Sequence, residues 1–135
     1  MTDRDLILAA IAARENAYTP YSRFRVGAAL LTQSGKVYTG CNVENAAYTP
    51  TNCAERTAFF KAVSEGERKF SAIAIVAAPE GAPLRKTAPC GVCRQVMMEF
   101  CNPETFRVIM AVSPEEYTVS TLGQLMPEGF GPSNL

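Results

Sequence analysis

The chain has 135 residues, of which 47% are hydrophobic and 19% charged, a composition that fits one folded domain and excludes a mainly disordered chain. Its 13 basic and 13 acidic residues give a formal net charge of zero, which argues against a protein that holds a nucleic-acid backbone. No apolar run reaches the roughly 20 residues that span a bilayer, so we expect one cytoplasmic domain over residues 1–135 whose five cysteines are thiols.

The first elements expected along the chain are a helix and a strand hairpin. Apolar residues recur at helical spacing over Leu6–Ala13, which predicts a helix that ends near Tyr18-Thr19-Pro20. Phe24–Leu31 and Val37–Val43 have the composition of strands. The segment Gln33–Lys36 between them has the composition of a turn.

A second helix and a buried strand are expected next. After a loop over Asn45–Thr51, a helix is predicted from Asn52 or Cys53 to about Ser64, with Gly66 past its end as a cap. The run Ala72–Ala77 is continuously apolar, as in a strand that is covered on both faces.

The last third of the chain predicts further alternation of helix and strand. Following a loop, we expect a helix at Cys90–Phe100, a strand at Phe106–Val112, a short strand at Tyr117–Val119 and a helical turn at Leu122–Met126. Because a helix between two strands favours parallel pairing, the whole order predicts an α/β fold. We expect a three-layer α/β/α sandwich with a mixed sheet of about five strands.

Cysteine spacing indicates a metal site. Cys90-Gly91-Val92-Cys93 is a C-x-x-C pair, whose two thiolates can bind one zinc ion. The chain has no histidine, so a third ligand has to be another cysteine or a carboxylate. Cys101 lies about 12 Å from Cys93 if both are on one helix, and Cys41 lies within a predicted strand, so packing is the simpler interpretation of both.

Cys53 differs from Cys41 and Cys101 because it begins a predicted helix, as Cys90 does after Pro89. Two helix N-termini would then converge on one zinc ion, where their N–H groups and dipoles stabilise thiolates. Three ligands leave a fourth position for water, as in catalytic zinc sites. The pKa of such a water falls to about 7, and Glu55 is placed to move its protons.

Each part of this pattern also has a simpler interpretation. Asn52-x-x-Glu55 resembles a capping box, and the C-x-x-C pair resembles a redox pair at a helix start. Neither alternative explains Cys53-Ala54-Glu55 together with Pro89-Cys90-x-x-Cys93, so the joint pattern favours a zinc hydrolase.

The same motifs resemble a known family, the small homotetrameric zinc-dependent cytidine deaminases, over nearly the whole chain. The matching stretches are Phe24–Leu30, Gly40–Tyr48, Cys53–Arg56 and Pro89–Gln95. The resemblance implies hydrolytic deamination of cytidine and deoxycytidine to uridine and deoxyuridine with release of ammonia, as in pyrimidine salvage. It also implies one zinc ion per subunit, no organic cofactor, and a homotetramer in which neighbouring subunits complete each site.

The resemblance implies how the base would be held. Phe24 would pack against the pyrimidine ring, the Ala54 N–H would hold the carbonyl O2, and Glu55 would hold N3. The Pro89 carbonyl would accept a hydrogen bond from the exocyclic amine. Zinc-bound hydroxide would attack C4, while Glu55 carries protons from the water to N3 and to the departing amine.

The resemblance further implies contacts with the sugar and between subunits. Asn42 and Glu44 would bind the ribose hydroxyls. Tyr48 and Phe130 match positions that contribute to a neighbouring subunit's site. No nucleic acid or membrane is expected as a partner.

Charge counting leads to one more hypothesis. Zn²⁺ with three thiolates carries a net charge of −1, which disfavours a bound hydroxide. Arg56 follows Glu55 and Arg94 follows Cys93. Either arginine can donate hydrogen bonds to thiolate sulfur, and we expect both to tune the zinc ion.

Three other functions remain open at this point. One is another small zinc deaminase, such as blasticidin S deaminase, which the Phe24–Leu30 and Asn42–Tyr48 stretches oppose. A polynucleotide-editing deaminase is opposed by the neutral charge. A non-enzymatic zinc module would have a closed four-ligand site, with Cys41 recruited and no role for Glu55.

Overall fold

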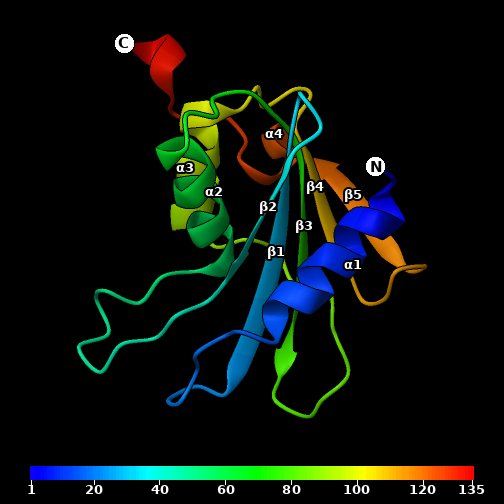
Figure 1. Cartoon of the computed structure of the whole chain (residues 1–135). Helices are drawn as coiled ribbons and strands as arrows, with labels where there is room; N and C mark the ends of the chain where they lie inside the picture. Colours follow the sequence, from blue (N-terminus) through cyan, green and yellow to red (C-terminus); the bar gives the residue numbers. More distant parts are fainter.

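Five strands form a single mixed sheet, in the order β2-β1-β3-β4-β5, in the computed structural model, which describes residues 1–135 (Figure 1). The strands are β1 (Phe24–Thr32), β2 (Val37–Cys41), β3 (Phe70–Pro79), β4 (Arg107–Ala111) and β5 (Tyr117–Thr121). β3 and β4 pair in parallel, and the other three pairs are antiparallel. The mixed sheet of about five strands is therefore confirmed.

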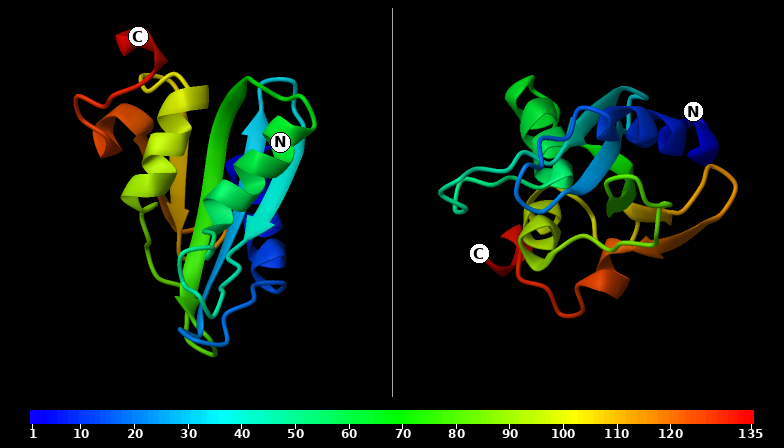
Figure 2. Two further views of the ribbon diagram at one scale, coloured as in Figure 1. Left: turned by 90° about the vertical axis from the view of Figure 1, so that its left-hand side faces the viewer. Right: turned by 90° about the horizontal axis from the view of Figure 1, so that it is seen from below.

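Helices cover both faces of this sheet, which confirms the three-layer α/β/α arrangement. α1 (Asp3–Arg14) packs on one face, and α2 (Ala54–Ser64) and α3 (Gly91–Phe100) pack on the other (Figures 1 and 2). The chain ends with the short α4 (Leu122–Leu125) and a 3₁₀ turn at Pro132–Asn134. None of these helices has the length and hydrophobicity needed to cross a membrane.

Alternate residues of β3 contribute to two separate apolar cores. Ile73 and Ile75 belong to the core beneath α2 and α3, whereas Ala74 and Val76 belong to the core beneath α1. This alternation follows from the two-residue period of a strand. All four side chains are buried, as the continuous apolar run predicts for a strand covered on both faces.

Two glycines allow helices to lie directly on strands. A Cβ atom at Gly27 of β1 would lie 2.1 Å from the Ala10 carbonyl oxygen of α1. A Cβ atom at Gly40 of β2 would lie 2.4 Å from the Ala54 carbonyl oxygen, at the first turn of α2. The second contact fixes the helix start that carries Glu55.

Two elements end at least two residues earlier than the sequence predicts. α1 ends at Arg14 and not near Tyr18–Pro20, because the Tyr18 backbone pairs with Asn42 and Glu44 instead of continuing the helix. β2 ends at Cys41 and not at Val43. These pairings hold the loop before β1 beside the loop after β2.

Candidate metal and catalytic site

A cavity of about 320 Å³ lies beside the starts of β1 and α2. Its wall combines the loop before β1, the start of β1, the loop between β2 and α2, the first turn of α2, part of β3, and the loop before α3. Cys53, Glu55 and Cys90 line it together with Phe24 and Glu44. Residues that are far apart in the sequence therefore meet at one concave surface.

The three cysteines predicted as ligands lie together at this cavity. Their sulfur atoms are all within 4.8 Å of one another, and Cys53 Sγ lies 3.8 Å from Cys90 Sγ. Zinc–sulfur bonds of about 2.3 Å in a tetrahedral site place two sulfurs about 3.8 Å apart, so the thiol set fits a zinc ion. Neither Cys41 nor Cys101 belongs to this cluster.

Helix starts position two of these ligands. Cys53 and Cys90 are the N-cap residues of α2 and α3, both in extended backbone conformation, and neither side chain caps its helix with a hydrogen bond. Their sulfurs are therefore free to bind a metal. Cys93 is fully buried in the first turn of α3. The unpaired N–H groups at both helix starts favour negative charge on the sulfurs.

Glu55 is buried next to the cysteine cluster, with 5% of its surface exposed. Burial raises the pKa of Glu55 to about 7, and the Cys53 thiolate adds to this shift. The capping-box interpretation does not hold, because Cys53 and not Asn52 is the N-cap, and it makes no side-chain cap bond. Glu55 is thus a buried carboxyl at the cavity wall, suited to hold and release a proton.

Arg56 contacts the cluster through Cys53. Its Nη2 donates to Cys53 Sγ at 3.2 Å. Hydrogen bonds from Cys93 and Arg56 lower the pKa of the Cys53 thiol to about 5, against the effect of burial. This is the arginine–sulfur contact that charge counting predicts at Arg56.

Arg94 has other partners than the predicted thiolate. Its Nε donates to the Pro89 carbonyl at 2.7 Å, and its Nη1 donates to the Leu125 carbonyl at 2.6 Å. Successive helix residues point about 100° apart, so Arg94 points away from the direction of Cys93 and toward α4. The prediction of a sulfur contact for Arg94 is therefore corrected.

Phe24 and Asn42 are joined by their hydrogen bonds. Asn42 Nδ2 donates to the Phe24 carbonyl at 2.8 Å, and Asn42 Oδ1 accepts from the Val26 N–H at 2.9 Å. An amide group has a second N–H and a second lone pair, so Asn42 retains capacity for a ligand. The Arg85 guanidinium lies 5.7 Å from the centre of the Phe24 ring.

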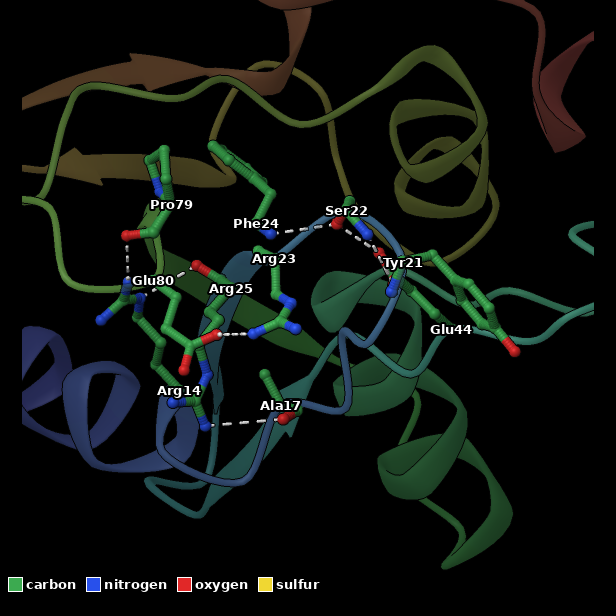
Figure 3. Close-up of polar contacts among 10 residues, drawn as sticks. All are labelled: Arg14, Ala17, Tyr21, Ser22, Arg23, Phe24, Arg25, Glu44, Pro79 and Glu80. Atoms are coloured by element: carbon green, nitrogen blue, oxygen red, sulfur yellow. Dashed lines mark hydrogen bonds and ion pairs between the residues drawn. The ribbon is translucent and has the colours of Figure 1, made fainter.

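Glu44 is held by the loop that precedes β1 (Figure 3). Its Oε1 accepts from the N–H groups of Tyr21 and Ser22 at 3.0 and 3.1 Å, and its Oε2 accepts from the Ser22 hydroxyl. These hydrogen bonds, the one from the Ser22 hydroxyl first, lower the pKa of the Glu44 carboxyl. Glu44 is thus an ordered carboxylate at the cavity.

Ala54 and Pro89 contribute backbone groups beside the cluster. Ala54 is the first residue of α2, so its N–H has no partner within the helix. The Pro89 carbonyl directly precedes Cys90 and keeps a second lone pair beside the bond from Arg94.

Tyr48 and Phe130 do not line the cavity of their own chain. Tyr48 is 71% exposed and Phe130 is 56% exposed. Tyr48 lines a neighbouring cavity of about 450 Å³ with Tyr21, Ser22, Glu44 and Thr51.

Four polar lining residues were not predicted from the sequence, namely Ser22, Thr51, Asn52 and Thr87. Ser22 carried one available signal, since it lies two residues before Phe24 and serine side chains often bond to backbone two residues on. Thr87 lies in a loop whose path the sequence alone did not indicate.

A family model supports the zinc interpretation. Residues 1–110 match the model described as "Cytidine and deoxycytidylate deaminase zinc-binding region".

Curated relatives and solved structures agree with that match. The chain is 52% identical over 123 residues to a cytidine deaminase of Sporosarcina psychrophila, covering 91% of this chain and 87% of the relative. A cytidine deaminase structure from Burkholderia pseudomallei has 52% identity and a TM-score of 0.87, covering 96% of this chain and all of the other. One from Mycobacterium tuberculosis has 39% identity and a TM-score of 0.81, covering 97% and 98%.

Proposed function

The chain belongs to the cytidine and deoxycytidylate deaminase family, and on that premise we propose that it hydrolyses cytidine and deoxycytidine to uridine and deoxyuridine. One water is consumed: its oxygen becomes the C4 carbonyl, the C4–N bond breaks, and the amino group leaves as ammonia. The observation that carries the proposal is the meeting of three thiols and a buried carboxyl at one cavity.

Cys53, Cys90 and Cys93 would hold the zinc ion. When bound by three thiolates, zinc supplies an open position and the Lewis acidity that makes a water nucleophilic near neutral pH. Arg56 donates to Cys53 Sγ and offsets part of the negative charge of the thiolates.

Glu55 is the proton carrier in this proposal. Its carboxylate accepts a proton from the attacking water, delivers it to N3 of the pyrimidine, and later carries a proton to the departing amine. Its burial supports this role, because the carboxyl can exist in either protonation state near neutral pH.

Three further groups hold the base in this proposal, and Arg94 positions one of them. Phe24 packs against the ring, and the Ala54 N–H binds O2. The Pro89 carbonyl accepts from the exocyclic amine, and Arg94 orients that carbonyl through a 2.7 Å hydrogen bond.

Asn42 and Glu44 bind the sugar hydroxyls. Their position at the same cavity as Cys53 supports this. Because both ribose and deoxyribose carry the 3′-hydroxyl, both nucleosides are proposed substrates.

Tyr48 and Phe130 are proposed to act across subunits of a homotetramer. Their high exposure in one chain supports this, since neither reaches the cavity of its own chain. Sedimentation of the purified protein checks the tetramer, and cell fractionation checks the predicted cytoplasmic location.

Zinc content and cytidine turnover of the purified protein test the function, together with Glu55→Gln. The amide keeps the size of the side chain but cannot accept and release a proton. We expect about one zinc per chain in both proteins and a loss of kcat of at least about 100-fold in the variant.

Each alternative function predicts a different result. A structural zinc module would retain its zinc and show no turnover in either protein. Another small deaminase would release ammonia from a different amine and leave cytidine unchanged.

A further inference from the structure

The Ser22 hydroxyl contacts two residues of the proposed substrate site at once (Figure 3). Its oxygen donates to Glu44 Oε2 and accepts from the Phe24 N–H at 3.0 Å. A hydroxyl can donate one hydrogen bond and accept two, so its donor is used. Glu44 and Phe24 come from different segments, and this one side chain joins them.

A further hydrogen bond links Phe24 back to the loop that carries Glu44. Asn42 Nδ2 donates to the Phe24 carbonyl at 2.8 Å, so the Phe24 peptide groups are held on both sides. Asn42 and Glu44 lie two residues apart on the loop after β2, and Ser22 and Phe24 lie two residues apart where the chain enters β1. Arg23 between the latter two has a φ of 59°, in the left-handed region, and this turn accompanies the return of the Ser22 oxygen to the Phe24 N–H.

The lone pairs of the Glu44 carboxylate limit the number of hydrogen bonds that it can accept. A carboxylate has about four acceptor positions. Two on Oε1 are used by the N–H groups of Tyr21 and Ser22, and one on Oε2 is used by the Ser22 hydroxyl. One position on Oε2 therefore remains, and it is adjacent to the Ser22 hydroxyl.

We propose that Ser22 is a positioning residue for sugar recognition: it directs the one remaining acceptor of Glu44 toward a single sugar hydroxyl, at a fixed place relative to Phe24. This assignment rests on the proposed function. It adds a residue that neither touches the metal cluster nor follows from the predicted contacts. Without the hydroxyl, Glu44 Oε2 has two open positions and the Phe24 N–H loses its partner.

The experiment compares two nucleosides in zinc-loaded enzyme. Cytidine carries the 3′-hydroxyl, and 2′,3′-dideoxycytidine lacks it. For Ser22→Ala we expect KM for cytidine to rise about tenfold, as for one charge-assisted hydrogen bond, with kcat within about threefold. KM for dideoxycytidine should stay within about twofold.

Four variants separate positioning from a general effect on folding. In a Glu44→Ala background, Ser22→Ala should change KM less than about twofold, because Ser22 then has no carboxylate to direct. Ser22→Thr should restore KM, whereas Ser22→Val, which has the shape of threonine but no hydroxyl, should not. This pair replaces Ser22→Ala if that variant fails to fold. Ser34→Ala, which removes a hydroxyl bonded to Thr32 in the β1–β2 turn, should match the wild type.

Several results would overturn the assignment. One is an unchanged KM for cytidine in Ser22→Ala, another an equal rise for both nucleosides, and a third an additive effect in the Glu44→Ala background. In each of these cases an active wild type leaves the proposed function intact. A zinc-loaded wild type that does not deaminate cytidine would instead overturn the proposed function and the assignment with it.

Discussion

Arg56 and Arg94 each follow a residue of the catalytic pattern, yet their guanidinium groups have different partners. Arg56 contacts Cys53 Sγ, whereas Arg94 contacts the carbonyls of Pro89 and Leu125. Sequence adjacency to a ligand therefore does not determine contact with it, because the direction of a side chain depends on its position around the helix. The two arginines should affect different properties of the enzyme.

Arg56→Gln is expected to weaken zinc binding, because Cys53 loses a charged donor that stabilises its thiolate. We expect faster loss of zinc to a chelator and a fall in kcat of about tenfold. Arg94→Gln should keep its zinc and change KM or kcat through the Pro89 carbonyl. Equal zinc loss from both variants, followed with a chromogenic chelator, would contradict this division.

At the scale of elements, Gly40 determines how closely the first turn of α2 approaches β2. Gly40→Ala would bring a methyl group within 2.4 Å of the Ala54 carbonyl oxygen, so the helix start must move. We expect a loss of about 1–3 kcal/mol in unfolding free energy. We also expect weaker zinc binding, because Cys53 and Glu55 would shift together.

Gly27→Ala is the matched control for this prediction. It creates a similarly severe contact, at 2.1 Å from the Ala10 carbonyl oxygen of α1 on the opposite face of the sheet. It should lower the melting temperature similarly and leave zinc affinity unchanged. If the two variants lose zinc equally, the effect of Gly40→Ala comes from general instability.

Local sequence patterns predict the elements well where a single segment determines its own structure. The apolar run of β3 and the end of α2 before Gly66, whose φ is +100°, are such cases. The predicted end of α1 was wrong, because the real end depends on backbone hydrogen bonds of Tyr18 with Asn42 and Glu44. The spacing of residues within one segment cannot reveal such long-range pairing. The cysteine cluster was predictable because N-cap positions carry a local signal, but the contacts of Ser22 depend on two loops meeting.

For the molecule as a whole, the charges of protein and substrate have a kinetic consequence. The protein has a formal net charge of zero. The proposed substrate is an uncharged nucleoside, so electrostatic steering cannot speed its association with the protein. We expect kcat/KM for cytidine to change less than about twofold between 50 and 500 mM salt. A steep fall with salt would indicate a charged substrate and would favour the polynucleotide alternative.

Asp3 and Arg107 link the start of α1 to β4 by two hydrogen bonds, of 2.9 and 2.7 Å. The bond to Arg107 holds the pKa of Asp3 below its ordinary value near 4. A lowered folded pKa stabilises the protein above the unfolded value, and this contribution disappears as pH falls through the folded value. Because both side chains are partly exposed, we expect the pair to contribute about 1 kcal/mol at neutral pH.

Melting temperatures of Asp3→Asn and wild type, measured from pH 7 to pH 2.5, check this contribution. The difference should be constant above about pH 5 and shrink as pH falls below the unfolded pKa of Asp3. Glu115→Gln, which removes the more exposed pair with Arg4, should match the wild type throughout. A difference for Asp3→Asn that is as large at pH 2.5 as at pH 7 would contradict the role of the charge.

The N-cap positions of α2 and α3 also have a consequence for engineering this protein toward higher folding stability. Thr2 and Thr121 cap their helices with hydroxyl groups, but Cys53 and Cys90 leave that position without a hydrogen bond. A rule-based redesign would replace both cysteines by serine or aspartate and gain about 1 kcal/mol at each. The substitutions that would stabilise these helices most would thus abolish the metal site. This is expected where selection has retained catalytic activity at the expense of folding stability.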